Sequence, residues 1–171
     1  VLTQSEVRGL RLFIDPSKTH CMRCHNGPYF SNFGFHNIGS GVNPDSGARD
    51  FGRYFGLRSA KADEFNCVGS HSDVEREECR DLIYSTEGHA DDGAFKVPGL
   101  RDVALTAPYF HDGRFETLRE SLDFYRSPPD QLTSGNELLP LELSDEELQD
   151  LAEFLGSLTG ENKREAQILS E

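Results

Sequence analysis

The pentapeptide Cys21-Met22-Arg23-Cys24-His25 constrains this chain more than any other feature of its sequence. Two cysteines separated by two residues and followed directly by histidine are typical of a c-type haem attachment site. At this spacing one helical turn presents both sulfurs to the porphyrin vinyl groups, and the adjacent imidazole lies beneath the iron. The motif therefore predicts one covalent haem c, bonded to Cys21 and Cys24 and ligated by His25.

Two other uses of paired cysteines fit the sequence less well. A zinc site would need a second closely spaced ligand pair, whereas the remaining cysteines, Cys67 and Cys79, lie twelve positions apart. A thioredoxin-like redox pair would follow a strand in an alternating strand–helix pattern, which this sequence does not show. We therefore interpret the motif as a haem site.

Composition sets the size and class of the fold. The 171 residues suffice for one ordinary core, or for one domain that carries a sizeable insertion. A hydrophobic content of 36% is low, and 16 glycines and 8 prolines predict much loop. A porphyrin would supply the apolar mass that the side chains lack.

The expected location follows from the haem chemistry. No apolar run approaches the length of a membrane span, so we expect no membrane insertion. The chain begins at Val1 and contains no signal peptide, which suggests a processed or trimmed chain. Thioether attachment of haem takes place on the outer side of an energy-transducing membrane, so we expect a periplasmic or otherwise exported protein.

The net charge of −13 limits the possible partners. It argues against nucleic acid and against anionic membrane surfaces. It favours a basic or dipolar electron-transfer protein as partner, although a charged, solvated surface requires no partner at all. Both interpretations remain open.

Local signals predict helices at the two ends of the chain. A capping box from Thr3 to Glu6 precedes apolar residues at helical spacing, and Asp15-Pro16 ends this helix. A second capping box, Ser144 to Glu147, begins a helix that Gly160 ends. Gly9 would allow a close helix crossing. We therefore expect an all-α fold with long loops, of the class I cytochrome c type.

The middle of the chain has a different character. Residues 26–60 show no sustained periodicity and are expected to be haem-wrapping loops, and residues 61–93 form a charged surface excursion. Residues 117–125 regain helical spacing, and 126–140 are a loop. We expect one haem domain over 1–160, with a loop insertion at about 40–93, and a polar tail over 161–171.

The two cysteines of the surface excursion are expected to form a disulfide. An oxidising compartment permits a bond between Cys67 and Cys79. Two free thiols in a loop are the alternative.

Three stretches of sequence together point to one family. The first is Leu2–Phe13 leading into Cys21–Pro28, and the second is Phe35-His36-Asn37-Ile38-Gly39. The third is Ala94–Gly113, which continues to Tyr125. It contains the motifs Pro98-Gly99-Leu100-Arg101 and His111-Asp112-Gly113. This pattern resembles the C-terminal haem domain of bacterial di-haem cytochrome c peroxidases and their relative MauG. The match covers most of the chain outside 40–93 and the tail.

The resemblance implies an enzyme component. Members of the family have two haem domains, of which the N-terminal one reacts with hydrogen peroxide and the C-terminal one passes electrons to it or shares its oxidising equivalents. This chain has one haem motif, so the missing partner would be a second haem domain or subunit. The family also holds calcium at the interface between the two domains. A monohaem electron-transfer cytochrome and a haem subunit of a larger multihaem complex are the alternatives.

The second axial ligand is partly constrained by the sequence. The only methionine, Met22, lies between the attachment cysteines and cannot reach the distal face, which excludes a His/Met haem. The resemblance implies Tyr125, because MauG-like members place a tyrosine ligand on the helix after His-Asp-Gly. A packing role for Tyr125 stays open, with His36, His111 or an open or water-bound site as other possibilities.

One arginine is implicated in binding the haem periphery. The resemblance places Arg101 where a guanidinium would face a haem propionate, a role suited to paired hydrogen bonds. An ordinary surface ion pair is the alternative.

Overall fold

The computed structural model describes residues 1–129 and 135–160, which form two compact units. Within this described part, the first unit comprises residues 1–34, 97–129 and 138–160, and the second comprises 35–96 and 135–137. The predicted insertion over 40–93 falls inside the second unit. The predicted tail over 161–171 lies outside the described residues.

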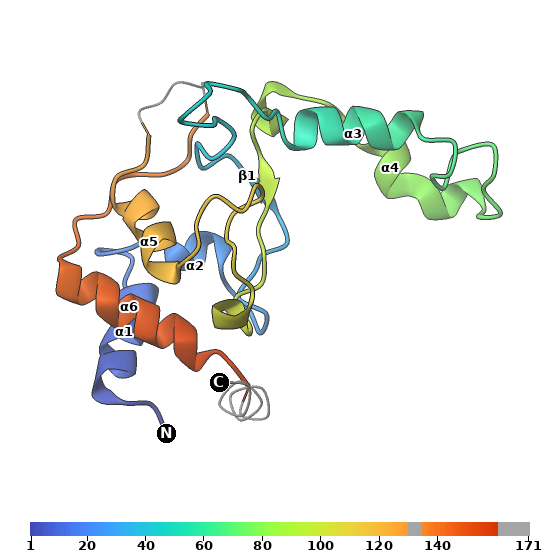
Figure 1. Cartoon of the computed structure of the whole chain (residues 1–171). Helices are drawn as coiled ribbons and strands as arrows, with labels where there is room; N and C mark the ends of the chain where they lie inside the picture. The colour runs from blue at the N-terminus through green and yellow to red at the C-terminus, as the bar shows by residue number, and fades with distance from the viewer. Residues whose placement is uncertain (130–134, 161–171) are drawn as a thin grey trace. The chain divides into compact units, whose positions relative to one another are not determined.

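The first unit is built from helices. They are α1 (Gln4–Ile14), α2 (Cys21–Cys24), the short 3-10 helix η3 (Val103–Leu105), α5 (Leu118–Arg126) and α6 (Asp145–Ser157) (Figure 1). The expected helices at the two ends of the chain and near residues 117–125 are confirmed. The last helix ends at Ser157 with Leu158 as its C-cap, slightly earlier than the predicted end at Gly160.

Capping boxes begin the three long helices of this unit. At each start the hydroxyl of a Ser or Thr accepts a hydrogen bond from the backbone N–H of a glutamate three residues later. The carboxylate of that glutamate in turn accepts from the backbone N–H of the Ser or Thr. The pairs are Thr3 with Glu6, Thr117 with Glu120, and Ser144 with Glu147. These bonds satisfy N–H groups that have no partner inside the helix. The helix starts are therefore fixed by local sequence.

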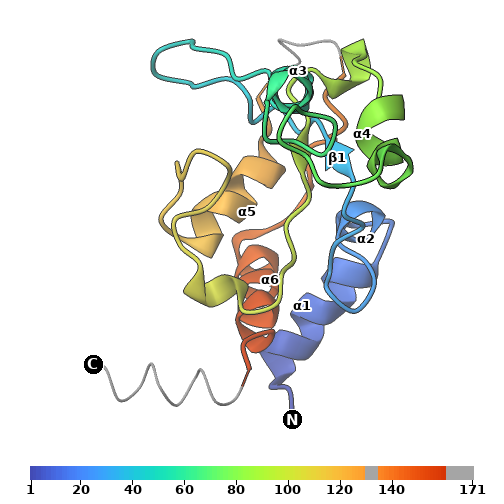
Figure 2. The same ribbon diagram turned by 90° about the vertical axis from the view of Figure 1, so that its right-hand side faces the viewer.

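The close crossing of α1 and α6 organises the core of the first unit, and the two helices lie side by side in both views (Figures 1 and 2). Gly9 is buried at the contact, against the backbone of Asp150. A cluster of buried side chains surrounds the crossing, made of Phe13, Val103, Leu122, Leu143, Leu148, Leu151, Phe154 and Leu155. The predicted role of Gly9 in a helix contact is confirmed.

The second unit combines short helices with a small sheet. Its elements are β1 (Phe35–His36), α3 (Arg53–Ala62), η1 (Arg76–Cys79), α4 (Arg80–Tyr84), η2 (His89–Asp91) and β2 (Phe95–Lys96). The two strands pair antiparallel, with Phe35 opposite Lys96 and His36 opposite Phe95. The fold is thus mostly helical with long loops, and this pair of strands is a small departure from the expected all-α class.

The loop predicted over residues 26–60 is wrong for the part that α3 occupies. Of the ten residues of α3, only Leu57 is buried, so the sequence carries no apolar stripe at helical spacing. Periodicity is the signal on which a sequence-based helix assignment depends. A helix exposed on almost all sides gives no such signal.

The predicted disulfide between Cys67 and Cys79 is present. The two Cα atoms are 5.7 Å apart, within the ordinary range for a disulfide. The bond joins the segment after α3 to the end of η1, where Cys79 is buried.

No helix in the described part of the chain is both long and apolar enough to span a bilayer.

Candidate haem site

Helix α2 carries the two predicted attachment cysteines on a single turn. Neither Cys21 nor Cys24 is in a disulfide, and the side chain of Cys21 packs against the core cluster of the first unit. Burial raises the pKa of the Cys21 thiol, and a hydrogen bond with Thr19 opposes that rise. The spacing predicted from sequence therefore exists as a helical turn beside an apolar core.

A buried threonine ties this turn to the end of α1. The hydroxyl of Thr19 donates to the carbonyl of Leu12 at 2.6 Å, and its backbone N–H donates to the carbonyl of Asp15 at 2.9 Å. Thr19 is only 1% exposed. Buried polar groups that are fully hydrogen-bonded hold the backbone in one arrangement. The start of α2 is therefore held in place relative to the end of α1.

His25 is oriented by hydrogen bonds from its backbone and its ring. Its N–H donates to the carbonyl of Cys21 at 2.8 Å, and its ring Nδ1 lies 3.0 Å from the carbonyl oxygen of Phe30. Because a carbonyl oxygen only accepts, Nδ1 is the donor, and in the neutral ring Nε2 then carries the lone pair. A histidine that ligates a metal commonly donates its other N–H to a carbonyl in this manner.

The loop that supplies the Phe30 carbonyl is itself tightly bonded. Asn32 N–H donates to Cys24 O and Ser31 N–H to Asn26 O, both at 2.8 Å. The Ser31 hydroxyl, which is buried, donates to the carbonyl of Val97 at 2.8 Å. Phe30 adopts a left-handed φ of 53°, a conformation uncommon outside glycine that persists only where surrounding contacts enforce it. We call residues 26–33 the proximal loop.

Tyr125 lies on α5, and its hydroxyl is affected by the two predicted attachment cysteines. Burial around its hydroxyl raises the pKa of Tyr125 strongly, and the charges of the Cys21 and Cys24 groups raise it further. An influence of both sulfurs on one phenol means that the three groups lie within electrostatic reach of one another. All three residues belong to the first unit, and the two cysteines lie close enough for their charges to affect the Tyr125 hydroxyl.

An aromatic cluster orients the helix that carries Tyr125. The Phe110 ring lies 4.9 Å from those of Phe115 and Phe124 and 6.1 Å from that of Tyr125, between ring centroids. Offset and edge-on packing of this kind is favourable beyond simple burial. Phe110 comes directly before His111, so the His-Asp-Gly turn and α5 are linked by ring contacts.

The two alternative histidine ligands occupy different surroundings. His36 belongs to the second unit, where its Nδ1 lies 2.7 Å from a carboxylate oxygen of Glu137. His111 belongs to the first unit and is exposed beside Asp112, whose pKa is lowered mainly by a hydrogen bond with Arg114 and slightly by His111.

Arg101 lies against the proximal loop. Its Nε donates to the carbonyl of Pro28 at 2.8 Å, and its guanidinium carbon is 5.3 Å from the centre of the Phe30 ring. The side chain is exposed and makes no ion pair with any residue that the structure describes. The contacts described for Arg101 are thus a hydrogen bond and a ring contact, and its role toward haem stays a prediction.

Two contributors to this site were missed by sequence reasoning. No sequence pattern marks the Phe30 carbonyl as the acceptor for His25, because any residue supplies a carbonyl. Phe110 lies in the stretch that carries the family resemblance, but its ring contacts depend on the tertiary structure.

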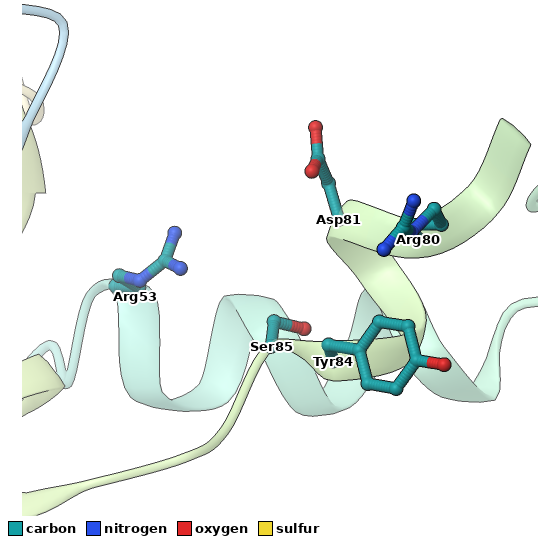
Figure 3. Close-up of a pocket in the computed structure, with 5 residues that line it drawn as sticks. All are labelled: Arg53, Arg80, Asp81, Tyr84 and Ser85. Atoms are coloured by element: carbon teal, nitrogen blue, oxygen red, sulfur yellow. The ribbon is translucent and has the colours of Figure 1, made fainter.

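The second unit has an open surface hollow of about 640 Å³, lined by Arg53, Arg80, Asp81, Tyr84 and Ser85 (Figure 3). Arg53 extends from α3, whereas the other four residues belong to α4 or follow it. None of them was predicted to bind haem. Within residues 1–129 and 135–160, no group of three or more His, Cys, Asp or Glu side chains could hold a metal ion.

Comparison with known proteins identifies the class. The chain is 36% identical over 162 residues to the cytochrome-c peroxidase IdrP1 of Pseudomonas sp. (strain SCT), covering 92% of this chain and 41% of that protein. It is 29% identical over 160 residues to the methylamine utilization protein MauG of Methylophilus methylotrophus, covering 93% of this chain and 38% of that protein. No protein-family profile matches the sequence.

A solved structure supports the same relationship. A MauG-like protein associated with microbial copper homeostasis matches 95% of this chain and 49% of its own, with a TM-score of 0.60 and 26% identity. The chain is therefore similar, over nearly all of its length, to part of the bacterial haem peroxidases. More particularly, it is a homologue of the di-haem cytochrome c peroxidases and MauG, and it spans about two-fifths of the length of these curated relatives.

Proposed function

We propose that this chain is the c-type haem domain of a di-haem peroxidase of the MauG-like branch, which relays or stores oxidising equivalents derived from hydrogen peroxide. The observation that carries the proposal is the hydrogen bond between His25 and Phe30. It holds the ring beside Cys21 and Cys24 in the tautomer that an iron ligand requires. Homology to cytochrome c peroxidases and MauG supports the reaction class.

The residues fit a covalently attached haem, which would supply the redox chemistry when bound. Cys21 and Cys24 would form the two thioether bonds, and His25 would ligate iron through Nε2. Tyr125 would be a second iron ligand, and Arg101 would pair with a propionate. These roles rest on the family resemblance together with the contacts of each side chain.

Tyr125 suits a role in holding oxidised iron. A phenolate is a hard anionic donor that stabilises ferric and higher-valent iron. The surrounding protein raises the pKa of Tyr125 and so favours the neutral phenol. Ionisation would therefore depend on a positive charge at the iron, which couples the phenol proton to haem binding.

The remaining expectations extend the proposal. The first unit, with α1 crossing α6 beside the haem motif, would be a class I cytochrome c-type domain. The partner would be a second haem domain or subunit, with calcium at the interface, and a basic electron-transfer protein could deliver electrons. The protein would act in the periplasm or another exported location.

Retention of haem after denaturation tests the cofactor. Acid–acetone extraction should leave the haem on the wild-type polypeptide, because thioether bonds survive unfolding. Replacing both cysteines, Cys21→Ala with Cys24→Ala, should release it. The matched control is Cys67→Ala with Cys79→Ala, which removes two cysteines elsewhere and should retain the haem. A native preparation without haem would refute the proposal.

A second candidate is a monohaem electron carrier. Adding hydrogen peroxide to the chain with its partner domain distinguishes the two functions. Formation of an oxidised, ferryl-type spectrum and a low reduction potential support the peroxidase. A reversible one-electron couple without any reaction with peroxide supports the carrier.

A further inference from the structure

The segment that follows Pro98 packs against the backbone of the proximal loop. The backbone N–H of Leu100 donates to the carbonyl of Tyr29 at 3.2 Å. A Cβ atom at Gly99 would lie 3.0 Å from the same carbonyl oxygen, which is tighter than most contacts of this kind, so a side chain there would push slightly against the loop. Residues 99–101 therefore pack directly on the backbone that leads to Phe30.

Arg101, in the same segment, contacts the proximal loop at Pro28 and Phe30. Its Nε donates to the carbonyl of Pro28, two residues before Phe30, and its guanidinium lies over the Phe30 ring. A planar guanidinium that donates a hydrogen bond to a backbone carbonyl and stacks on a ring restrains the positions of both groups. Arg101 thus restrains Phe30 in two ways: through the backbone at Pro28 and directly at the Phe30 ring.

We infer that Arg101 is a positioning residue for His25, acting through Pro28 and Phe30 and not only through the haem periphery. The carbonyl of Phe30 is the acceptor for His25 Nδ1, so a shift of this residue lengthens or bends that hydrogen bond. Its effect on an iron ligand rests on the proposed function, whereas its effect on the hydrogen bond does not.

This role is compatible with a propionate contact. Nε is committed to Pro28, and the two terminal nitrogens of the guanidinium make no hydrogen bond to the described residues. Those two nitrogens remain available to a carboxylate. Arg101 would then link the proximal loop to the edge of the haem.

Two substitutions separate geometry from charge. Arg101→Lys keeps the positive charge but loses the Nε donor and the planar stack, and Arg101→Gln removes the charge as well. The readout is the exchange rate of the His25 Nδ1 proton, measured by NMR on the chain as isolated. Loss of one supporting hydrogen bond should speed this exchange by about tenfold in both variants.

The control is Arg11→Lys, at an exposed arginine in the last turn of α1, outside both the proximal loop and residues 99–101. In this variant the His25 Nδ1 proton should exchange at the same rate as in the wild type. Unchanged exchange in both Arg101 variants overturns the inference, as does faster exchange in Arg101→Gln alone, which would reveal an effect of charge. A wild-type chain without haem overturns only the proposed function, because the readout joins two protein groups.

Discussion

Gly9 of α1 lies against the main chain of Asp150 in α6, so closely that a Cβ atom on Gly9 would be 2.6 Å from the carbonyl carbon of Asp150. The same atom would be 2.7 Å from Cβ of Phe154. Both distances are shorter than real contacts of this kind, and the first atom is rigid backbone. The distance between the two helices is therefore set by the absence of a side chain.

We predict that Gly9→Ala destabilises the first unit. Overpacking a close contact typically costs about 1–3 kcal/mol, which outweighs the gain of about 1 kcal/mol in helix propensity. Chemical denaturation measures the free energy of unfolding. The control is Gly156→Ala in α6, where a new Cβ meets nothing within 4 Å. That variant should be neutral or slightly more stable, and equal effects at both positions would contradict the packing argument.

Asp150 should make the stability of the first unit sensitive to acid. Asp150 is 6% exposed, and its carboxylate accepts from Arg8 through Nε and Nη2, both at 2.6 Å, and from the Ser5 hydroxyl. The hydrogen bond with Arg8 is the main cause that lowers the pKa of Asp150. A carboxyl group whose pKa is lower in the folded state stabilises it above the unfolded pKa, and this contribution is lost as pH falls through the folded pKa.

Asp150→Asn should therefore lower the free energy of unfolding at neutral pH and differ less from the wild type below about pH 4. Unfolding curves at a series of pH values test this. Glu153→Gln, at an exposed position on the same helix, should change stability little at any pH. A difference between Asp150→Asn and wild type that does not depend on pH would show that the charge of Asp150 is unimportant.

The disulfide between Cys67 and Cys79 should act locally. Mass analysis without reductant should find one peptide pair bridged at these residues. Cys67→Ser with Cys79→Ser should speed amide hydrogen exchange within 61–93, because the cross-link no longer restricts that segment. Exchange in α1 and α6 should be unchanged. Native thiols at both positions that react with alkylating reagents would disprove the bond.

Tyr125→Phe should open the second axial position of the iron. The ferric spectrum should change to high spin and the reduction potential should rise, because an anionic donor is lost. Haem attachment should persist, since Cys21, Cys24 and His25 are untouched. Absorption spectra and potentiometric titration measure both effects.

The matched control is Tyr109→Phe, a second tyrosine of the first unit, whose hydroxyl donates to the carbonyl of Val103 at 3.0 Å. It should leave the spectrum and potential unchanged. If Tyr125→Phe also changes neither, Tyr125 is a packing residue, and His36 or His111 becomes the next candidate ligand.

The sequence by itself determined the features that depend on residues a few positions apart. The spacing of Cys21, Cys24 and His25 defines a haem motif because all three lie within about one helical turn. The capping boxes at Thr3 and Ser144 determine where the helices begin, because each joins residues three positions apart.

The tertiary structure alone decided what depends on groups distant in sequence or without a distinctive side chain. The acceptor for His25 is a main-chain carbonyl, which every residue has, and its position depends on a loop held by Val97 and Arg101. Helix α3 escaped prediction because it buries only Leu57 and so has no periodic apolar face. The approach of Tyr125 to Cys21 and Cys24 joins segments about a hundred residues apart, which only packing of the folded chain can bring together.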